Sequence, residues 1–116
     1  MQPEERDNAY LWDMLDAAQA IAEFVHGKTY HDYETNRMLR SAVERNIEII
    51  GEAARRISET TQKKHPKIPW RSIIGQRNFW AHEYDEILHE AIWKLAINRI
   101  PELVNMLIEI MPEDYK

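Results

Sequence analysis

The chain has 116 residues, of which 44% are apolar and 30% are charged. This length and composition fit one folded domain with a buried core and exclude a disordered chain. The absence of cysteine excludes disulfides, thiolate metal sites and a cysteine nucleophile, and it is compatible with a reducing cytosol. The N-terminal stretch MQPEERDNAY is acidic, and no apolar run approaches the roughly 20 residues that span a bilayer. We therefore expect a cytoplasmic protein with no membrane partner.

The net charge of −5 is unevenly distributed along the chain. Residues 55–82 hold seven Lys/Arg and one Glu, so their charge is 7 − 1 = +6. The remaining residues hold 8 basic and 19 acidic side chains, so their charge is 8 − 19 = −11. Such an asymmetry indicates either a phosphate-binding patch on an acidic body or ordinary solvated charges. The candidate phosphate-binding side chains are Arg55, Arg56, Lys63, Lys64 and Arg71.

Two long helices are predicted in the first half of the chain. Residues 5–26 carry apolar side chains at spacings of three and four, and Gly27 follows where a helix end favours a positive φ. Residues 27–35 are predicted as a connector. The second helix is expected over residues 34–62, with the stripe Leu39, Val43, Ile47, Ile50, Ala54 and Ile57. Gly51 lies inside this helix, where a glycine often permits close approach of another backbone.

Two further helices are predicted in the second half. A short one is expected over residues 69–82, with Pro69 in its first position, where a missing N–H costs nothing. The last helix is expected over residues 88–111, kinked or split by Pro101. Its expected buried residues are Ile92, Leu95, Ala96, Val104, Leu107 and Ile108. No segment alternates as a strand would, so the pattern predicts an all-α, up-and-down bundle.

The stretch RNFWAHEY at residues 77–84 is the candidate reaction centre. Arginine supplies a permanent charge and a fork of donors for a phosphoryl group, and histidine can move a proton near neutral pH. These residue types suit cleavage of RNA by its own 2′-hydroxyl without a metal. On an ideal helix Arg77 and His82 lie about 140° apart, whereas Asn78 and His82 lie about 40° apart. We therefore favour a cleft shared by two subunits over a site on one helix face.

Structural explanations of the same residues remain open at this point. An Arg and a His at this spacing occur by chance in many helices, and Asn78 is also typical of helix ends. Phe79 and Trp80 are more typical of a core than of base stacking. A metal site is a further alternative, because His82, Glu86 and His89 follow one another at spacings of four and three.

The stretch IPWRSIIGQRNFWAHEY resembles the signature of the HepT-like toxins, a branch of the HEPN superfamily. Those proteins carry R-N-x-x-x-H-x-Y after a P-W-x-x-I-x-G element. The upstream stretch VERNIEIIGEAARRIS also resembles the second helix of the family, and Trp93 lies in its expected place in the last helix. The chain departs from the family at Trp80 and Ala81, where aliphatic residues are common, and in the acidic DEILHE after Tyr84.

The resemblance implies a single HEPN domain over residues 1–116, folded as a four- to five-helix bundle. It implies a homodimer in which two R-x4-H motifs face one cleft, and a metal-independent endoribonuclease that needs no cofactor. Arg77 and His82 would then be the catalytic pair, with Asn78 as their polar neighbour. RNA would be the substrate, and the five basic side chains named above would contact it.

The resemblance also implies a role as the toxin of a type II- or VII-like toxin–antitoxin pair. The partner would be a minimal nucleotidyltransferase (MNT-type) antitoxin, which adds AMP to Tyr84 and so places negative charge beside the RNA cleft. The expected assembly is a homodimer, or a larger hetero-oligomer with the antitoxin. The competing hypothesis is a non-catalytic HEPN module that binds a nucleotide or RNA, or that assembles with a partner.

Overall fold

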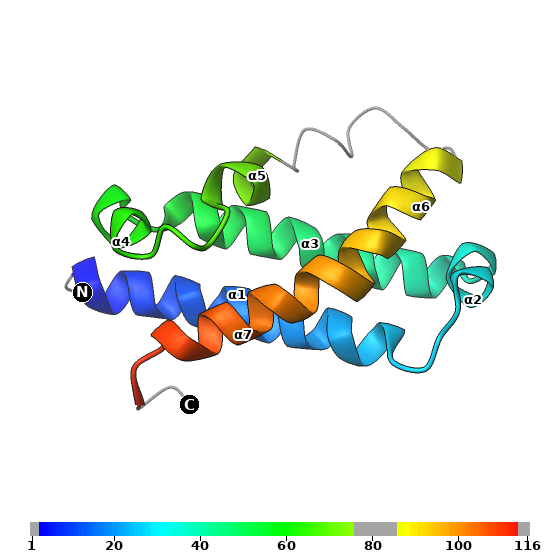
Figure 1. Cartoon of the computed structure of the whole chain (residues 1–116), viewed down its shortest axis with the longest axis horizontal. Helices are drawn as coiled ribbons and strands as arrows, with labels where there is room; N and C mark the ends of the chain where they lie inside the picture. Colours follow the sequence, from blue (N-terminus) through cyan, green and yellow to red (C-terminus); the bar gives the residue numbers. More distant parts are fainter. Residues whose placement is uncertain (1–2, 76–85, 114–116) are drawn as a thin grey trace.

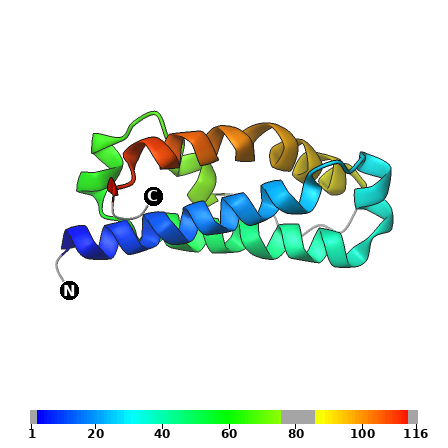
Figure 2. The same cartoon turned by 90° about the horizontal axis from the view of Figure 1, so that it is seen from below.

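The computed structural model describes residues 3–75 and 86–113. Every regular element in these two ranges is a helix and none is a strand, which confirms the expected all-α class. The long helices α1 (Pro3–Val25) and α3 (Arg37–Arg56) lie side by side and antiparallel. A third long segment, made of α6 (Glu86–Lys94), the π-helix η2 (Leu95–Arg99) and α7 (Ile100–Ile110), crosses them (Figures 1 and 2). Dimerisation stays a prediction, because the structure contains one chain.

The predicted first helix is confirmed as α1, and its apolar stripe enters the core. Leu11, Met14, Ala18 and Ile21 are almost fully buried. Gly27 follows with φ +74°, the left-handed conformation that glycine adopts without strain. Helices α2 (Tyr30–Thr35), α3, α5 (Trp70–Gly75), α6 and α7 also contribute core residues, whereas α4 (Glu59–Lys64) has no buried residue. The largest fully buried side chains of the whole core are Tyr33, Met14, Ile21, Ile92, Leu107 and Val43.

The stretch predicted as a connector, residues 27–35, contains the short helix α2 (Tyr30–Thr35). Thr29 begins this helix with a capping box: its hydroxyl accepts from the Asp32 N–H at 3.1 Å, and the Asp32 carboxylate accepts from the Thr29 N–H at 2.9 Å. The prediction was wrong because the stretch has no apolar period. Its helix is set by the cap and by burial of Tyr33.

The predicted helix over residues 34–62 is two helices, α3 and α4 (Glu59–Lys64). The break falls at Ile57, whose backbone is extended, with φ −74° and ψ 136°. Ser58 then caps α4 through its hydroxyl, and the Asp7 carboxylate of α1 accepts hydrogen bonds from both the Ser58 N–H and hydroxyl. The periodicity missed this break because a residue 51 positions away in the chain helps to make it.

The predicted third helix is described only in its first part, α5 (Trp70–Gly75). It begins one residue later than expected: Pro69 precedes it, and its carbonyl accepts the hydrogen bond from Ile73 N–H at 3.0 Å. Residues 76–82 of the predicted helix lie outside the described residues. Gly51 does permit the close approach that we expected, because a methyl group there would lie 3.4 Å from the carbonyl oxygen of Ile73.

The predicted fourth helix is split, as expected from Pro101, but the split is a π-helix. The Ile100 N–H donates to the Leu95 carbonyl oxygen, a spacing of five residues, and α7 then begins at Ile100 with Pro101 in its first turn. Because Pro101 has no N–H, it cannot continue the regular ladder from α6. Ile92, Ala96 and Leu107 are buried as predicted, and Leu95 and Val104 are half-buried. Ile108 was wrongly placed in the core, since it is 39% exposed.

Candidate active site

The candidate reaction centre lies between α5 and α6 in the chain. The residues predicted to do chemistry, Arg77, Asn78 and His82, and the predicted modification site Tyr84, all lie outside the described residues. The structure does describe the two helices that flank them, which end at Gly75 and begin at Glu86. What the structure shows of the site is therefore how these two helices are fixed to the core.

Helix α5 is fixed to α3 by one buried aromatic residue and one close backbone approach. Trp70 is 7% exposed, and its indole N–H donates to the carbonyl oxygen of His65 at 3.0 Å. Ile73 is equally buried, and its carbonyl oxygen faces Gly51. The PW dipeptide thus starts a short helix that is held by its buried side chains, by the backbone approach to α3 at Gly51, and by a hydrogen bond to the end of α4 at His65.

Helix α6 is fixed by a second aromatic group. Leu88, Ile92 and Trp93 are buried. The Trp93 ring lies 5.5 Å from the Tyr33 ring and 6.4 Å from the Tyr30 ring, both measured between centroids. Tilted aromatic pairs at such distances are favourable beyond their buried area. Both ends of the motif-bearing stretch therefore enter helices that are held to the body of the fold.

The five predicted RNA-contacting side chains are exposed and lie on three successive helices. Arg55 and Arg56 are in the last turn of α3, Lys63 and Lys64 in the last turn of α4, and Arg71 near the start of α5. Arg55 is partly neutralised, because its guanidinium donates to both Glu52 carboxylate oxygens at 2.7 and 2.9 Å. The other four form no ion pair with any residue in ranges 3–75 and 86–113. Cations in a last helical turn also complement the helix dipole, so exposure alone does not demonstrate RNA contact.

A hollow of about 320 Å³ lies between α3, α5 and the η2–α7 segment. Its walls are mostly apolar, with Ile47 and Ile50 from α3, Ile73 from α5, and Leu103 from α7. At its edge Arg99 and Glu102 form an exposed ion pair at 3.8 Å. The sequence did not predict this hollow, because it arises where the π-helix changes the direction of the last helical segment.

In the described part of the chain, no group of three or more His, Asp or Glu side chains is arranged so that it could hold a metal ion. The alternative zinc site is not tested by this finding, because His82 lies outside the described residues. Among the helices described, none is long and apolar enough to cross a membrane.

Comparison with known proteins relates this chain to a family of HepT-like ribonucleases. The model of the family described as ribonuclease HepT-like matches residues 14–110. A Methanocaldococcus jannaschii protein named as a putative RNase is 37% identical over 95 residues, which cover 82% of this chain and 87% of the relative. The chain therefore belongs to the HepT-like ribonuclease family.

Two other relatives agree with this assignment. A putative RNase of Caldanaerobacter subterraneus subsp. tengcongensis is 33% identical over 105 residues, covering 90% of this chain and 94% of the relative. A protein of Thermococcus cleftensis named as a probable ribonuclease HepT is 34% identical over 94 residues, which cover 81% of this chain and 86% of the relative. No solved structure gives a significant match. Membership confirms the family resemblance given by the sequence signature and supports an RNA substrate.

Proposed function

We propose that this chain is a metal-independent endoribonuclease and the toxin of a toxin–antitoxin pair. The observation that carries the proposal is the R-x4-H-x-Y motif at residues 77–84, inside the segment matched by the ribonuclease family. The relatives named as RNases cover most of the chain. The helices α5 and α6 on either side of the motif are each anchored by buried aromatic residues, as a preorganised site requires.

In the proposed reaction the ribose 2′-hydroxyl attacks the adjacent phosphorus and the 5′-oxygen of the next nucleotide leaves. His82 takes the proton from the 2′-hydroxyl and returns it to the departing 5′-oxygen, so that the products are a 2′,3′-cyclic phosphate and a 5′-hydroxyl; an imidazole can carry out both transfers near neutral pH. Arg77 stabilises the charge that builds on the phosphoryl oxygens, because its guanidinium offers two parallel donors. Asn78 is their polar neighbour, which orients the imidazole of His82 or binds a phosphate oxygen. No metal ion enters the scheme.

The site is proposed to form between two subunits. On one ideal helix Arg77 and His82 would point about 140° apart. A homodimer in which two motifs face each other would let an arginine and a histidine reach the same phosphodiester. The exposed cations Arg56, Lys63, Lys64 and Arg71, with a smaller contribution from the paired Arg55, are proposed to contact the RNA backbone. Phosphate contacts of this kind would position the RNA without reading its sequence.

The central test is cleavage of RNA by the purified protein in EDTA. Arg77→Ala and His82→Ala should each abolish cleavage and leave the helical circular dichroism unchanged. The matched controls are Arg45→Ala and His31→Ala, which remove an Arg and a His that are 70% and 78% exposed. Cleavage that persists in both motif variants, or that disappears in EDTA, would refute the assignment. Specific RNA binding with no product would instead favour the binding-module hypothesis.

Neutralisation is proposed to occur by transfer of AMP from ATP to Tyr84, catalysed by an MNT-type nucleotidyltransferase antitoxin. Each added phosphate brings negative charge beside the RNA cleft and would repel the substrate. Incubation with such an enzyme and ATP should increase the mass by AMP and suppress cleavage. Tyr84→Phe should block the mass change and keep the protein active in the presence of the enzyme and ATP. A modified Tyr84→Phe protein would contradict this site.

A further inference from the structure

The hollow between α3, α5 and the η2–α7 segment combines an apolar interior with a polar rim. We call it the η2 hollow, and Figure 1 shows the helices that border it. Its interior is formed by buried side chains from three helices: Ile47 and Ile50 of α3, Ile73 of α5 and Leu103 of α7. Its volume of about 320 Å³ lies at the lower end of the range of about 300–1,000 Å³ that ligand sites occupy. Such sites also have apolar walls and a few polar groups that orient the ligand.

The rim of the η2 hollow carries polar groups that are able to bind a ligand. Arg99 and Glu102 approach each other to 3.8 Å, which is too long for a hydrogen bond. Their side chains are 75% and 63% exposed, and exposed ion pairs of this kind contribute little to stability. A ligand can therefore accept from the guanidinium and donate to the carboxylate at small cost. Ser72 adds an exposed hydroxyl from the α5 side.

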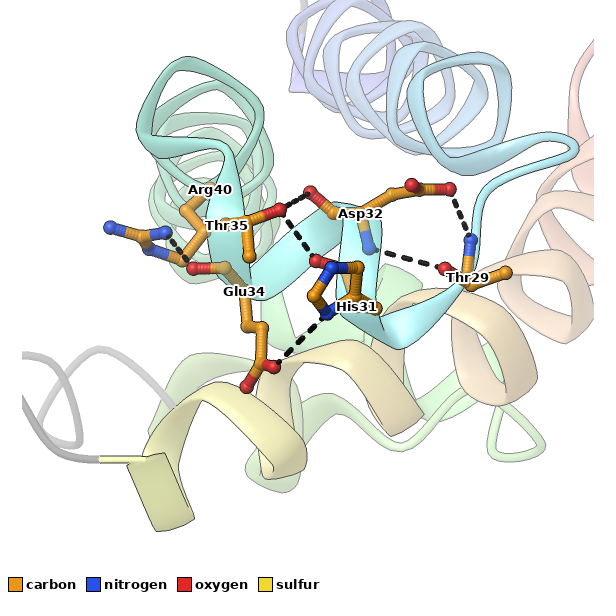
Figure 3. A network of polar contacts seen from close by, with 6 residues as sticks. All are labelled: Thr29, His31, Asp32, Glu34, Thr35 and Arg40. Atoms are coloured by element: carbon orange, nitrogen blue, oxygen red, sulfur yellow. Dashed lines mark hydrogen bonds and ion pairs between the residues drawn. The ribbon is translucent and has the colours of Figure 1, made fainter.

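A more open and more polar hollow, lined by residues within 27–39, lies at the start of α3. Several polar groups beside it bind one another within α2 and its cap. The Asp32 carboxylate accepts from the Thr29 N–H at 2.9 Å, and the Thr35 hydroxyl donates to the His31 carbonyl oxygen at 2.7 Å (Figure 3). These contacts hold α2 together, whereas Arg99 and Glu102 stand at the edge of an apolar recess. The η2 hollow is therefore the better candidate for a ligand site.

The charges around the η2 hollow favour an occupant that carries phosphate. Arg99 lines the hollow on the η2 side. On the α5 side, Arg71 is next to Ser72 in the chain, is exposed, and forms no ion pair with any residue in ranges 3–75 and 86–113. Because the chain belongs to a ribonuclease family, RNA is the phosphate-bearing molecule to expect. Single-stranded RNA offers phosphates to the cations and also planar bases that can leave the stack and pack between side chains.

We propose that the η2 hollow is a nucleobase subsite for the RNA substrate. The flat face of one base packs against the aliphatic side chains in the interior, and its Watson–Crick edge reaches the rim. There the Glu102 carboxylate accepts from an exocyclic amino group, and the Arg99 guanidinium donates to a ring nitrogen or a carbonyl oxygen. Cytosine presents both kinds of group, whereas uracil has no exocyclic amino group, so cytosine should bind better. This proposal deepens the proposed ribonuclease function and rests on it.

Binding of short RNA mimics tests the base preference. Oligomers of 2′-O-methylcytidine and of 2′-O-methyluridine are suitable probes, because a blocked 2′-oxygen cannot attack the phosphorus and no cleavage interferes. The wild type should bind the cytosine oligomer about five- to tenfold more tightly than the uracil oligomer, as one good hydrogen-bonded base contact provides. Equal binding of the two oligomers would overturn the proposal.

Two variants of α7 assign the preference to the rim. Glu102→Ala should reduce the ratio of the two affinities to below about twofold, because the acceptor for the amino group is lost. The matched control is Glu109→Ala, which removes the same charge from an exposed position of the same helix and should keep the wild-type ratio. A general gain in RNA affinity from the lost negative charge is common to both variants and cancels in the ratio. An unchanged ratio in Glu102→Ala would overturn the proposal.

Methyl NMR locates the base. Cytidine monophosphate should shift the methyl resonances of Ile47, Ile50 and Leu103, whereas ribose 5-phosphate, which has the sugar and the phosphate but no base, should leave them unchanged. Ser72→Trp, which places a large side chain at the rim, should abolish the shifts caused by cytidine monophosphate. Ser41→Trp, at an exposed position of α3, is its control and should keep them. Absence of shifts with the nucleotide, or equal shifts with ribose 5-phosphate, would overturn the proposal.

The NMR experiment separates the subsite from the ribonuclease assignment, since it needs no cleavage. If the methyl groups shift with the nucleotide but the wild type cleaves no RNA, the ribonuclease function fails and a base-binding hollow stands. If RNA is cleaved but the methyl groups do not respond, the subsite alone fails. Shifts caused by a partner protein and by no nucleotide would also overturn the subsite, because they would assign the hollow to a protein contact.

Discussion

The Asp7 carboxylate is expected to be a main stabilising contact between α1 and the start of α4. It is 6% exposed and accepts hydrogen bonds from the Ser58 N–H at 3.0 Å and from the Ser58 and Thr61 hydroxyls, both at 2.6 Å. Asp7→Asn keeps the shape but removes the charge and replaces one acceptor oxygen by a donor. Because hydrogen bonds to charged groups contribute about 1.5–3 kcal/mol each, we expect a loss of about 2.5 kcal/mol.

Thermal unfolding followed by circular dichroism measures this loss. For a domain of this size it corresponds to a fall in melting temperature of about 10 °C at pH 7. The control is Asp16→Asn, an exposed acid on the same helix, which should shift the melting temperature by less than about 2 °C. A fall for Asp7→Asn no larger than that of the control would refute the reasoning.

The pH dependence gives a second check on Asp7. Burial raises the pKa of its carboxyl, but the hydrogen bonds from Ser58 and Thr61 outweigh burial and hold it below the ordinary value of 3.8. A lowered folded pKa means that the stabilisation is complete above the unfolded pKa and disappears as the pH falls through the folded pKa. The difference in melting temperature between wild type and Asp7→Asn should therefore shrink as the pH is lowered from about 5 to 2.

Three further predictions concern Gly51, Gly27 and the basic helix ends. Gly51→Val should lower the melting temperature measured by circular dichroism and loosen α5. A Cβ at this position would already lie 3.4 Å from the carbonyl oxygen of Ile73, so the valine methyl groups would collide with that backbone. Gly51→Ala adds only the Cβ and should be neutral or slightly stabilising in the same measurement. Gly27→Ala should cost about 1 kcal/mol in urea unfolding, since φ is +74° there. Exchanging Lys63 and Lys64 for Gln should weaken RNA binding and reduce its salt dependence, with unchanged melting temperature; an unchanged salt slope would contradict their contact with phosphates.

The long amphipathic helices could be predicted from sequence because their apolar periods are local. The stripe of α3, including Val43, Ile47 and Ile50, is buried as its spacing indicated. The turn at Gly27 was also predictable, because it needs the positive φ that glycine adopts without strain. For the helices and for Gly27, the physical cause lies in the residue and its neighbours in the chain, whereas at Gly51 the sequence showed only that a backbone could approach, not that it would be Ile73.

The missed features depend on contacts between distant residues. The end of α3 at Ile57 depends on Asp7, and helix α2 depends on a cap and on the burial of Tyr33. The sequence could not distinguish the π-helix before Pro101 from a simple kink, because either arrangement accommodates a residue that has no N–H for the helical hydrogen bonds. Ile108 was misplaced because the buried face of α7 runs through Ile100, Leu103 and Leu107, and Ile108 lies outside it.

The candidate site shows the same division. The motif at residues 77–84 and the family that carries it were recognisable from residue types and spacing, and the family is confirmed. The anchoring of the flanking helices was not recognisable, because it comes from pairs such as Trp93 with Tyr33 and Trp70 with the His65 carbonyl.

Two carboxyl groups, one buried and one half-buried, illustrate how hydrogen bonding decides whether an ionised acid stabilises the fold. Asp7 has a lowered pKa because hydrogen bonds overcome the cost of burial, so its ionised form stabilises the fold. Glu44 has a raised pKa because burial dominates, so its ionised form opposes folding near neutral pH. Removing the charge of Asp7 should therefore weaken the fold, whereas removing the charge of Glu44 should leave the melting temperature at pH 7 unchanged or slightly higher.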